Sequence, residues 1–144
     1  MTPQEIAERS AAALAGKDAA TPWLGARIEA VGPGRATLSL VVQPHHLNGQ
    51  GTCHGGVIST LADSAFAYAC NSFNQLTVAQ ENTVTYLSPA RPGEPLTATC
   101  TETARSGRSG IYDVTVTGGD GRTVALLRGL SRSLGTPLFS DGNG

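Results

Sequence analysis

The sequence predicts an α+β domain in which an antiparallel β-sheet of about five to six strands wraps around one long central helix. Two observations carry this prediction. The run from Gly55 to Cys70 is almost entirely small or apolar, with one carboxylate in its middle, and it is long enough for a helix of several turns that is buried nearly all round. Short β-rich segments, bounded by glycine-rich and proline-rich turns, lie on both sides of this run.

The composition of the chain indicates one domain over residues 1–144 that associates with copies of itself. A chain of 144 residues is long enough for a single core. Charged residues make up 15% of it, which is below the usual level of roughly 25% and favours a homo-oligomer. The net charge is -1 and no basic run is present, so nothing indicates a nucleic-acid or membrane partner.

The cysteines and the N-terminus give an expectation for the compartment. Cys53, Cys70 and Cys100 are odd in number and widely spaced, which favours reduced thiols over a disulfide framework. The N-terminus has no charged segment followed by an apolar one, and no apolar run resembles a membrane span. We therefore expect a cytoplasmic protein.

The N-terminal segment predicts a short peripheral helix within residues 1–20. Thr2 supplies an N-cap, Pro3 takes the first helical position, and Glu5 follows three residues after the threonine. The alanine-rich run after these residues stops at Gly16.

The remaining strands are predicted from alternation and turn composition. Residues 26–31 and 35–42 alternate as strands around Gly32-Pro33-Gly34 and predict a hairpin, which a loop over residues 43–53 follows. After the central helix we expect an antiparallel meander, and residues 135–144 are expected to form a flexible tail. A sheet that curls around the helix gives the hotdog architecture. The segments of the meander are 77–87, 96–105, 111–117 and 122–133.

Asp63 is an unusual residue in this helix, because it is charged and the helix is expected to be buried. It is the only charged residue between Gly55 and Gln80. Removing a carboxylate from water costs several kcal/mol unless it is paired or hydrogen-bonded, and such positions are enriched in functional sites. The plainer alternative is that Ser59, Thr60 or backbone groups of a partner satisfy it.

The glycine pair Gly55-Gly56 at the helix start is a second candidate. Unpaired N–H groups and the helix dipole can polarise a carbonyl there, although the glycines can also serve only a tight turn. Asp63 lies eight residues later, or about 12 Å along a helix axis, too far for both to reach one carbonyl within a subunit. If both act on it, they come from different chains, as in two antiparallel helices across a two-fold axis.

Other clusters give weaker indications. The ligand spacing of His45, His46, Cys53 and His54 is not typical of a zinc site, so no metal is expected. Cys53 and His54 are adjacent and point in different directions, which does not favour a nucleophile pair. Three isolated arginines can meet phosphates: Arg105, Arg108 and Arg128. Arginines in strands and turns are more often simply solvated.

An extended motif makes the family resemblance specific. The chain reads N-G-Q-G-T-C-H-G-G over residues 48–56 and L-A-D-S-A-F-A-Y-A-C-N over residues 61–71. It continues with Y-L-S-P over 86–89, G-I-Y-D-V over 110–114 and V-A-L-L-R-G over 124–129. In these strings the chain strongly resembles the hotdog thioesterases of phenylacetate degradation, the PaaI family, over about residues 20–134.

The resemblance implies hydrolysis of acyl-CoA thioesters, with phenylacetyl-CoA or its ring-hydroxylated forms as typical substrates. It implies that Asp63 attacks the thioester or activates water, that Asn48 positions water or substrate, that His54 supports the site, and that the Gly55 N–H polarises the carbonyl. It also implies sites built from two protomers, a dimer as minimal unit and a homotetramer. No cofactor is expected, because coenzyme A is part of the substrate.

Several alternatives stay open at this point. The acyl group can be another one, such as hydroxybenzoyl or a medium chain, and Asp63 can be a nucleophile or a general base. A hotdog hydratase would leave the thioester intact, and a non-catalytic acyl-CoA-binding module would bind without turnover. Arg105 and Arg108 are the residues that we expect to meet the phosphates of coenzyme A.

Overall fold

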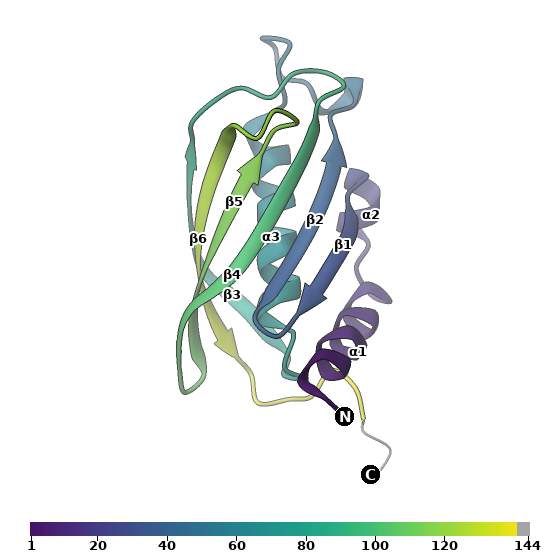
Figure 1. The fold of residues 1–144 in the computed structure, drawn as a ribbon, viewed down its shortest axis with the longest axis vertical. Helices are drawn as coiled ribbons and strands as arrows, with labels where there is room; N and C mark the ends of the chain where they lie inside the picture. Colours follow the sequence, from purple (N-terminus) through teal and green to yellow (C-terminus); the bar gives the residue numbers. More distant parts are fainter. Residues whose placement is uncertain (141–144) are drawn as a thin grey trace.

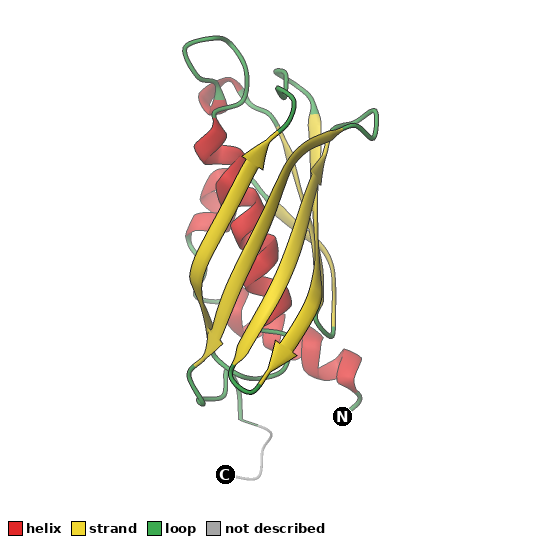
Figure 2. Cartoon of the chain, turned by 90° about the vertical axis from the view of Figure 1, so that its left-hand side faces the viewer, coloured by secondary structure: helices red, strands yellow, loops and turns green. Residues whose placement is uncertain are grey.

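One sheet wrapped around one helix makes up residues 1–140, the part of the chain that the computed structural model describes (Figures 1 and 2). The strands run across α3 and curl over it, so the predicted architecture is confirmed. The elements are α1 (Pro3–Ala15), α2 (Ala20–Leu24), β1 (Arg27–Gly32), β2 (Arg35–Val41), a 3-10 helix (Pro44–His46), α3 (Gly55–Cys70), β3 (Thr77–Tyr86), β4 (Pro95–Ser106), β5 (Ser109–Thr117) and β6 (Thr123–Ser133).

The core lies between α3 and the concave face of the sheet. Buried side chains of α3 face alternate positions of the central strands, and β5 shows strict alternation of buried and half-buried residues. Period-two burial on a sheet and a broad apolar face on a helix are the pattern from which this fold was predicted. Large side chains with almost no exposure are Leu38, Leu61, Phe66, Leu96, Tyr112, Val114 and Leu127.

The strand order corrects one prediction. The order is β1-β2-β4-β5-β6-β3, so β4, β5 and β6 form a meander but β3 does not pair with β4. α3 crosses the concave face and delivers the chain to the far edge, where β3 pairs with β6. The connection over residues 87–94 then returns across the end of the sheet to β4 (Figure 1). As a result β3 is an edge strand that lies beside α3.

The N-terminal segment follows the prediction only in part. Thr2 caps α1, and its side chain accepts a hydrogen bond from the Glu5 N–H across 3.1 Å. α1 ends at Ala15 with Gly16 as its C-cap, as predicted. The separate helix α2 was not predicted, because its five residues are too few to show a helical period. Hydrogen bonds from Tyr68 to Asp18 and between Thr21 and Ser64 tie this region to α3.

The C-terminal residues make contacts as far as they are described. The Asn74 Oδ1 accepts hydrogen bonds from the N–H groups of Leu138 and Phe139, and the Arg9 guanidinium lies over the Phe139 ring. Residues 141–144 lie outside the described residues, so the expectation of a flexible tail over 135–144 stays a prediction for them. No helix within residues 1–140 is long and apolar enough to cross a membrane.

Candidate active site

The first turn of α3 leaves one backbone donor free. His54 is the N-cap residue, and its Nδ1 accepts a hydrogen bond from the Gly56 N–H across 2.8 Å. The N–H groups of Val57 and Ile58 both donate to the His54 carbonyl. The Gly55 N–H makes no hydrogen bond to any of residues 1–140. Because it lies at the positive end of the helix dipole, this N–H can polarise a carbonyl or hold an oxyanion.

Gly55 faces a hollow of about 310 Å³ between α3, β3 and two loops. Tyr86 on β3 forms one side of it, and its hydroxyl donates a hydrogen bond to the Gly55 carbonyl across 2.9 Å. The hollow therefore combines a free backbone donor with mostly apolar walls, as binding sites for small molecules commonly do. Its lining residues are Asn48, Cys53, Gly55, Ile58, Tyr86, Leu87, Ser88 and Pro89.

Asn48 lines this hollow, but its side chain also shapes the loop. The Asn48 Oδ1 accepts hydrogen bonds from the N–H groups of Gln50 and Thr52, at 2.9 and 3.2 Å. Its Nδ2 donates to the Thr52 hydroxyl across 3.1 Å. A side chain held in this way is rigid. The second N–H of Asn48 Nδ2 makes no hydrogen bond within residues 1–140, so it can serve a bound water or substrate.

Asp63 lies on the side of α3 that faces β3, and it is less buried than predicted. Its side chain is half-buried in the single chain, because β3 is an edge strand with an open flank. The Asp63 Oδ1 accepts a hydrogen bond from Asn82 Nδ2 across 2.7 Å. Neither Ser59 nor Thr60 satisfies it, since the Thr60 hydroxyl donates to the Gly56 carbonyl instead.

The structure brings some of the predicted residues together and keeps others apart. Gly55 and Asn48 line one hollow, and His54 holds the helix start next to it. Asp63 lies two turns further along α3 and does not line that hollow, at a distance along the axis of about 12 Å. Asn82 was missed, and the alternation of the sequence gave no signal for it.

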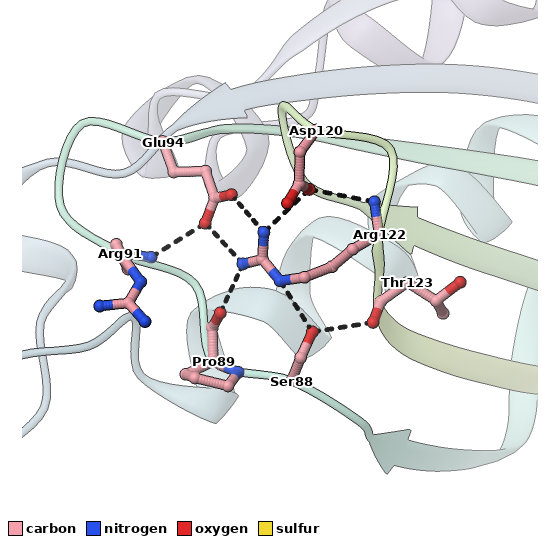
Figure 3. Close-up of polar contacts among 7 residues, drawn as sticks. All are labelled: Ser88, Pro89, Arg91, Glu94, Asp120, Arg122 and Thr123. Carbon is pink, nitrogen blue, oxygen red and sulfur yellow. Dashed lines mark hydrogen bonds and ion pairs between the residues drawn. The ribbon is translucent and has the colours of Figure 1, made fainter.

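The wall of the hollow at Ser88 and Pro89 is held by Arg122 (Figure 3). Its guanidinium donates to both oxygens of Glu94 at 2.8 and 2.9 Å and to Asp120 at 2.9 Å. It also donates to the Pro89 carbonyl at 2.6 Å and to the Ser88 hydroxyl at 3.1 Å. All five N–H groups of the guanidinium are thus used.

This cluster fixes the 87–94 connection between β3 and β4 to the turn between β5 and β6. The hydrogen bonds from Arg122 hold the pKa of Glu94 at about 2, well below its usual 4.5. The Cys53 N–H donates to the Ala90 carbonyl across 2.8 Å, so the same connection also supports the loop that precedes α3. Two loops that line the hollow are therefore joined to each other and to the sheet.

A larger hollow of about 500 Å³ lies on the other side of the start of α3. Trp23, which is 82% exposed, borders it together with His45 and His46. His46 is buried, its Nδ1 accepts from the Gln43 N–H, and its Nε2 contacts the Leu24 carbonyl across 2.8 Å. Both ring nitrogens are therefore occupied, and residues 1–140 contain no group of three or more side chains suited to hold a metal ion.

The arginines expected to meet phosphates lie at the opposite end of α3. Arg105 and Arg108 are at the turn between β4 and β5 and border a small hollow with Cys70 and Phe73. The Arg105 guanidinium stacks on the Phe73 ring at 3.8 Å. The 16 residues of α3 separate them from Gly55 within one chain, a length of about 24 Å. Arg128 forms an ion pair with Asp113 at 2.9 Å.

Comparison with known proteins gives a consistent result. The family model of the thioesterase superfamily matches residues 50–125. The acyl-coenzyme A thioesterase PaaI of Escherichia coli K12 is 39% identical over 133 residues, which cover 92% of this chain and 95% of that protein. The structure of E. coli PaaI, from the phenylacetic acid degradation operon, has 37% identity and a TM-score of 0.92, over 94% of this chain and 99% of that one. A mutant of the phenylacetic acid degradation protein PaaI from Thermus thermophilus has 35% identity and a TM-score of 0.78, over 81% and 100%.

Proposed function

The chain belongs to the thioesterase superfamily and is an acyl-CoA thioesterase of the PaaI type, and from this premise we propose that it hydrolyses phenylacetyl-CoA or ring-hydroxylated phenylacetyl-CoA. Two of the similar proteins carry phenylacetic acid degradation in their descriptions. The hollow beside Gly55 has mostly apolar walls, which suit an aromatic acyl group.

We further propose that the catalytic groups are the Gly55 N–H and the Asp63 carboxylate, each from a different subunit. The observation that carries this proposal is the free Gly55 N–H beside an apolar hollow to which residues 1–140 contribute no carboxylate. Asp63 of the same chain is about 12 Å away along the helix axis and cannot share its carbonyl. A second copy of α3, antiparallel to the first, supplies the missing carboxylate.

The exposed side of α3 supports such a pairing. Gly56, Ser59, Thr60, Asp63 and Ala67 follow one another on this side, and all are small or short side chains that are exposed or half-buried. Small residues let two helices approach closely. β3 borders this side, and its outer edge has no partner strand within residues 1–140.

A two-fold axis near Ser59 places Gly55 of each copy beside Asp63 of the other and creates two equivalent sites. The same pairing turns the Arg105 and Arg108 end of one copy toward the Asn48 loop of the other. These arginines are our candidates for the phosphates of coenzyme A. The pairing of two dimers into a homotetramer is part of the proposal.

The proposed reaction begins with the thioester carbonyl held by the Gly55 N–H. Asp63 then removes a proton from a water that attacks the carbonyl carbon, or its own oxygen attacks to form an anhydride that water opens. In either route the C–S bond breaks, coenzyme A leaves as the thiol, and the carboxylic acid is released. Asn48 positions water or the acyl group, and His54 maintains the helix start. No cofactor other than the substrate is needed.

The test is thiol release from phenylacetyl-CoA, hydroxyphenylacetyl-CoA, hydroxybenzoyl-CoA and octanoyl-CoA by wild type, Asp63→Asn and Glu81→Gln. Glu81 is the control because it borders a hollow on the outer side of the sheet. We expect Asp63→Asn to lose about two or more orders of magnitude in kcat at unchanged native mass, and Glu81→Gln to keep full activity. A preference for octanoyl-CoA contradicts the substrate proposal. An active Asp63→Asn contradicts the role of Asp63, and an absence of turnover favours a binding module.

A further inference from the structure

Asn82 is the one side chain within residues 1–140 that donates a hydrogen bond to the Asp63 carboxylate. Its amide holds Oδ1 at 2.7 Å, while Oδ2 has no hydrogen-bond partner in the described part of the chain. An amide N–H that binds one carboxylate oxygen restricts the rotation of the carboxylate and so fixes its plane. The second oxygen is left available on the exposed side of α3.

A β-bulge is what turns Asn82 toward α3. In the pairing of β3 with β6 the register shifts between Ala79 and Glu81. On the near side of the shift Ala79 pairs with the buried Ser131, and beyond it Asn82 pairs with the buried Gly129. Both therefore face the helix, whereas unbroken alternation would turn Asn82 outward. Bulges that redirect a side chain are over-represented next to active sites.

The distance between α3 and the sheet is also set at this point. A Cβ on Gly129 would lie 2.7 Å from the Phe66 ring, so glycine is what permits α3 to approach β6 this closely. Phe66 is one turn after Asp63, and Gly129 is the strand partner of Asn82. The close contact of Phe66 with Gly129 therefore brings the short side chain of Asn82 within reach of Asp63.

We propose that Asn82 is the positioning residue of the reaction, which orients the Asp63 carboxylate and leaves one oxygen for water or the thioester. This inference rests on the proposed catalytic role of Asp63. The titratable group next to this carboxylate on α3 is Cys70, which follows it on the same side of the helix. Its thiol is neutral, because burial and the charge of Asp63 raise its pKa to about 12. Glu81 of β3 and Arg128 of β6 border the hollow on the outer side of the sheet.

The test uses Asn82→Ala, Asn82→Ser and Asn82→Asp, with phenylacetyl-CoA as substrate. We expect Asn82→Ala to lower kcat by about tenfold to a hundredfold, because a misoriented catalytic group loses rate in this range. We expect KM to change by less than about threefold, since Asn82 acts on the chemical step. Asn82→Ser, which keeps a hydrogen-bond donor, should recover part of kcat.

The pH dependence separates positioning from a purely structural role. In Asn82→Asp two carboxylates meet at hydrogen-bond distance and do not both ionise easily. The acid limb of its kcat profile should therefore move to higher pH by about one unit or more. The matched control is Thr83→Asp, which adds the same charge at the next position of β3, on the side of the outer hollow, and should leave the limb in place.

Two outcomes overturn the inference. In one, Asn82→Ala keeps kcat within twofold of wild type, and in the other, the pH profiles of Asn82→Asp and Thr83→Asp coincide. Native mass and thermal midpoint are measured for every variant. If Asn82→Asp does not assemble, Asn82→Ser decides: a kcat above that of Asn82→Ala at unchanged KM supports the inference, and a kcat equal to that of Asn82→Ala overturns it. An active Asp63→Asn removes the proposed function, whereas an inactive Asp63→Asn with unaffected Asn82 variants removes only the positioning role.

Discussion

The hydroxyl of Tyr86 on β3 donates a hydrogen bond to the carbonyl of Gly55, the first residue of α3, across 2.9 Å. The Tyr86 ring lies so close that a Cβ on Gly55 would meet its Cζ at 3.2 Å and its Oη at 3.3 Å. The edge strand and the helix start are thereby fixed to each other, and the free Gly55 N–H keeps one orientation toward the hollow. The glycine at this position serves a close approach and not a positive φ.

We predict that Gly55→Ala separates activity from stability. The added methyl group must displace the Tyr86 ring and narrow the hollow, and we expect kcat/KM to fall about tenfold. The free energy of unfolding should change by less than about 1 kcal/mol, because the preference of a helix for alanine over glycine offsets the cost of moving the Tyr86 ring, which a Cβ would meet at 3.2 Å. Steady-state kinetics and urea unfolding measure the two effects.

The control for this prediction is Gly49→Ala. Gly49 has open space around its Cα and is not at a positive φ, so neither activity nor stability should change. If Gly55→Ala is as active as the control, the contact with Tyr86 does not shape the site.

The second prediction concerns acid stability and Glu94. Its pKa is lowered from 4.5 to about 2 by the hydrogen bonds from Arg122. A carboxyl group whose pKa is lower in the folded state stabilises the fold above its unfolded pKa, and this contribution is lost as the pH falls toward the folded pKa. Glu94→Gln should therefore be less stable than wild type at pH 7, by on the order of 1 kcal/mol because the pair is only partly buried.

The difference between wild type and Glu94→Gln should shrink between pH 4.5 and about 2. Chemical unfolding at a series of pH values measures it, and comparison of the two proteins isolates Glu94 from other carboxyl groups with lowered pKa, such as Asp18 and Asp113. A difference that stays constant with pH would show that the ion pair with Arg122 does not contribute to folding.

The sequence predicts the elements of this fold better than their arrangement. α3 and the strands follow from periodicity and from glycine-rich turns, which are local signals. The position of β3 at the edge of the sheet has no local signal, because a strand has the same sequence pattern whether it pairs with β4 or with β6. The connection over 87–94 was predicted close to its observed place, but as a turn between neighbouring strands, whereas it joins two strands that do not pair. The helix α2 was missed because it is too short to show a helical period.

The candidate site shows the same difference between local features, which the sequence predicts, and non-local ones, which it does not. The glycine pair at 55–56 predicted the start of α3, which the structure confirms. The lone charge singled out Asp63 from residue type alone, and its catalytic role stays a prediction. Asn82 was not predicted. The bulge in β3 reverses which positions face the helix, and no residue type at that place indicates a bulge. The distance between Gly55 and Asp63 is a property of helix geometry, so a site shared between subunits could be proposed before any tertiary contact was known.

The third prediction is that the thiols of the folded protein react slowly. Burial raises the pKa of Cys53 to about 11 and that of Cys70 to about 12, and it raises the pKa of Cys100 further. At pH 8 almost no thiolate is present, so a thiol-reactive dye should label these residues only after unfolding in guanidinium. In the control Ala12→Cys, an exposed site on α1, one thiol per chain should react at once. Fast labelling of the wild type would show that the core opens easily.

The last prediction tests the contact that brings Asn82 to Asp63. In Gly129→Ala the new methyl group overlaps the Phe66 ring, because a Cβ would lie 2.7 to 2.9 Å from three of its carbon atoms. Overpacking of this kind costs about 1–3 kcal/mol of stability. Since α3 must move away from β6, kcat should fall in parallel with that of Asn82→Ala. The double variant Gly129→Ala with Phe66→Leu removes the overlap and should recover part of both stability and kcat, which unfolding curves and steady-state kinetics measure. If the double variant recovers stability but not kcat, the approach of α3 to β6 does not control the orientation of Asp63.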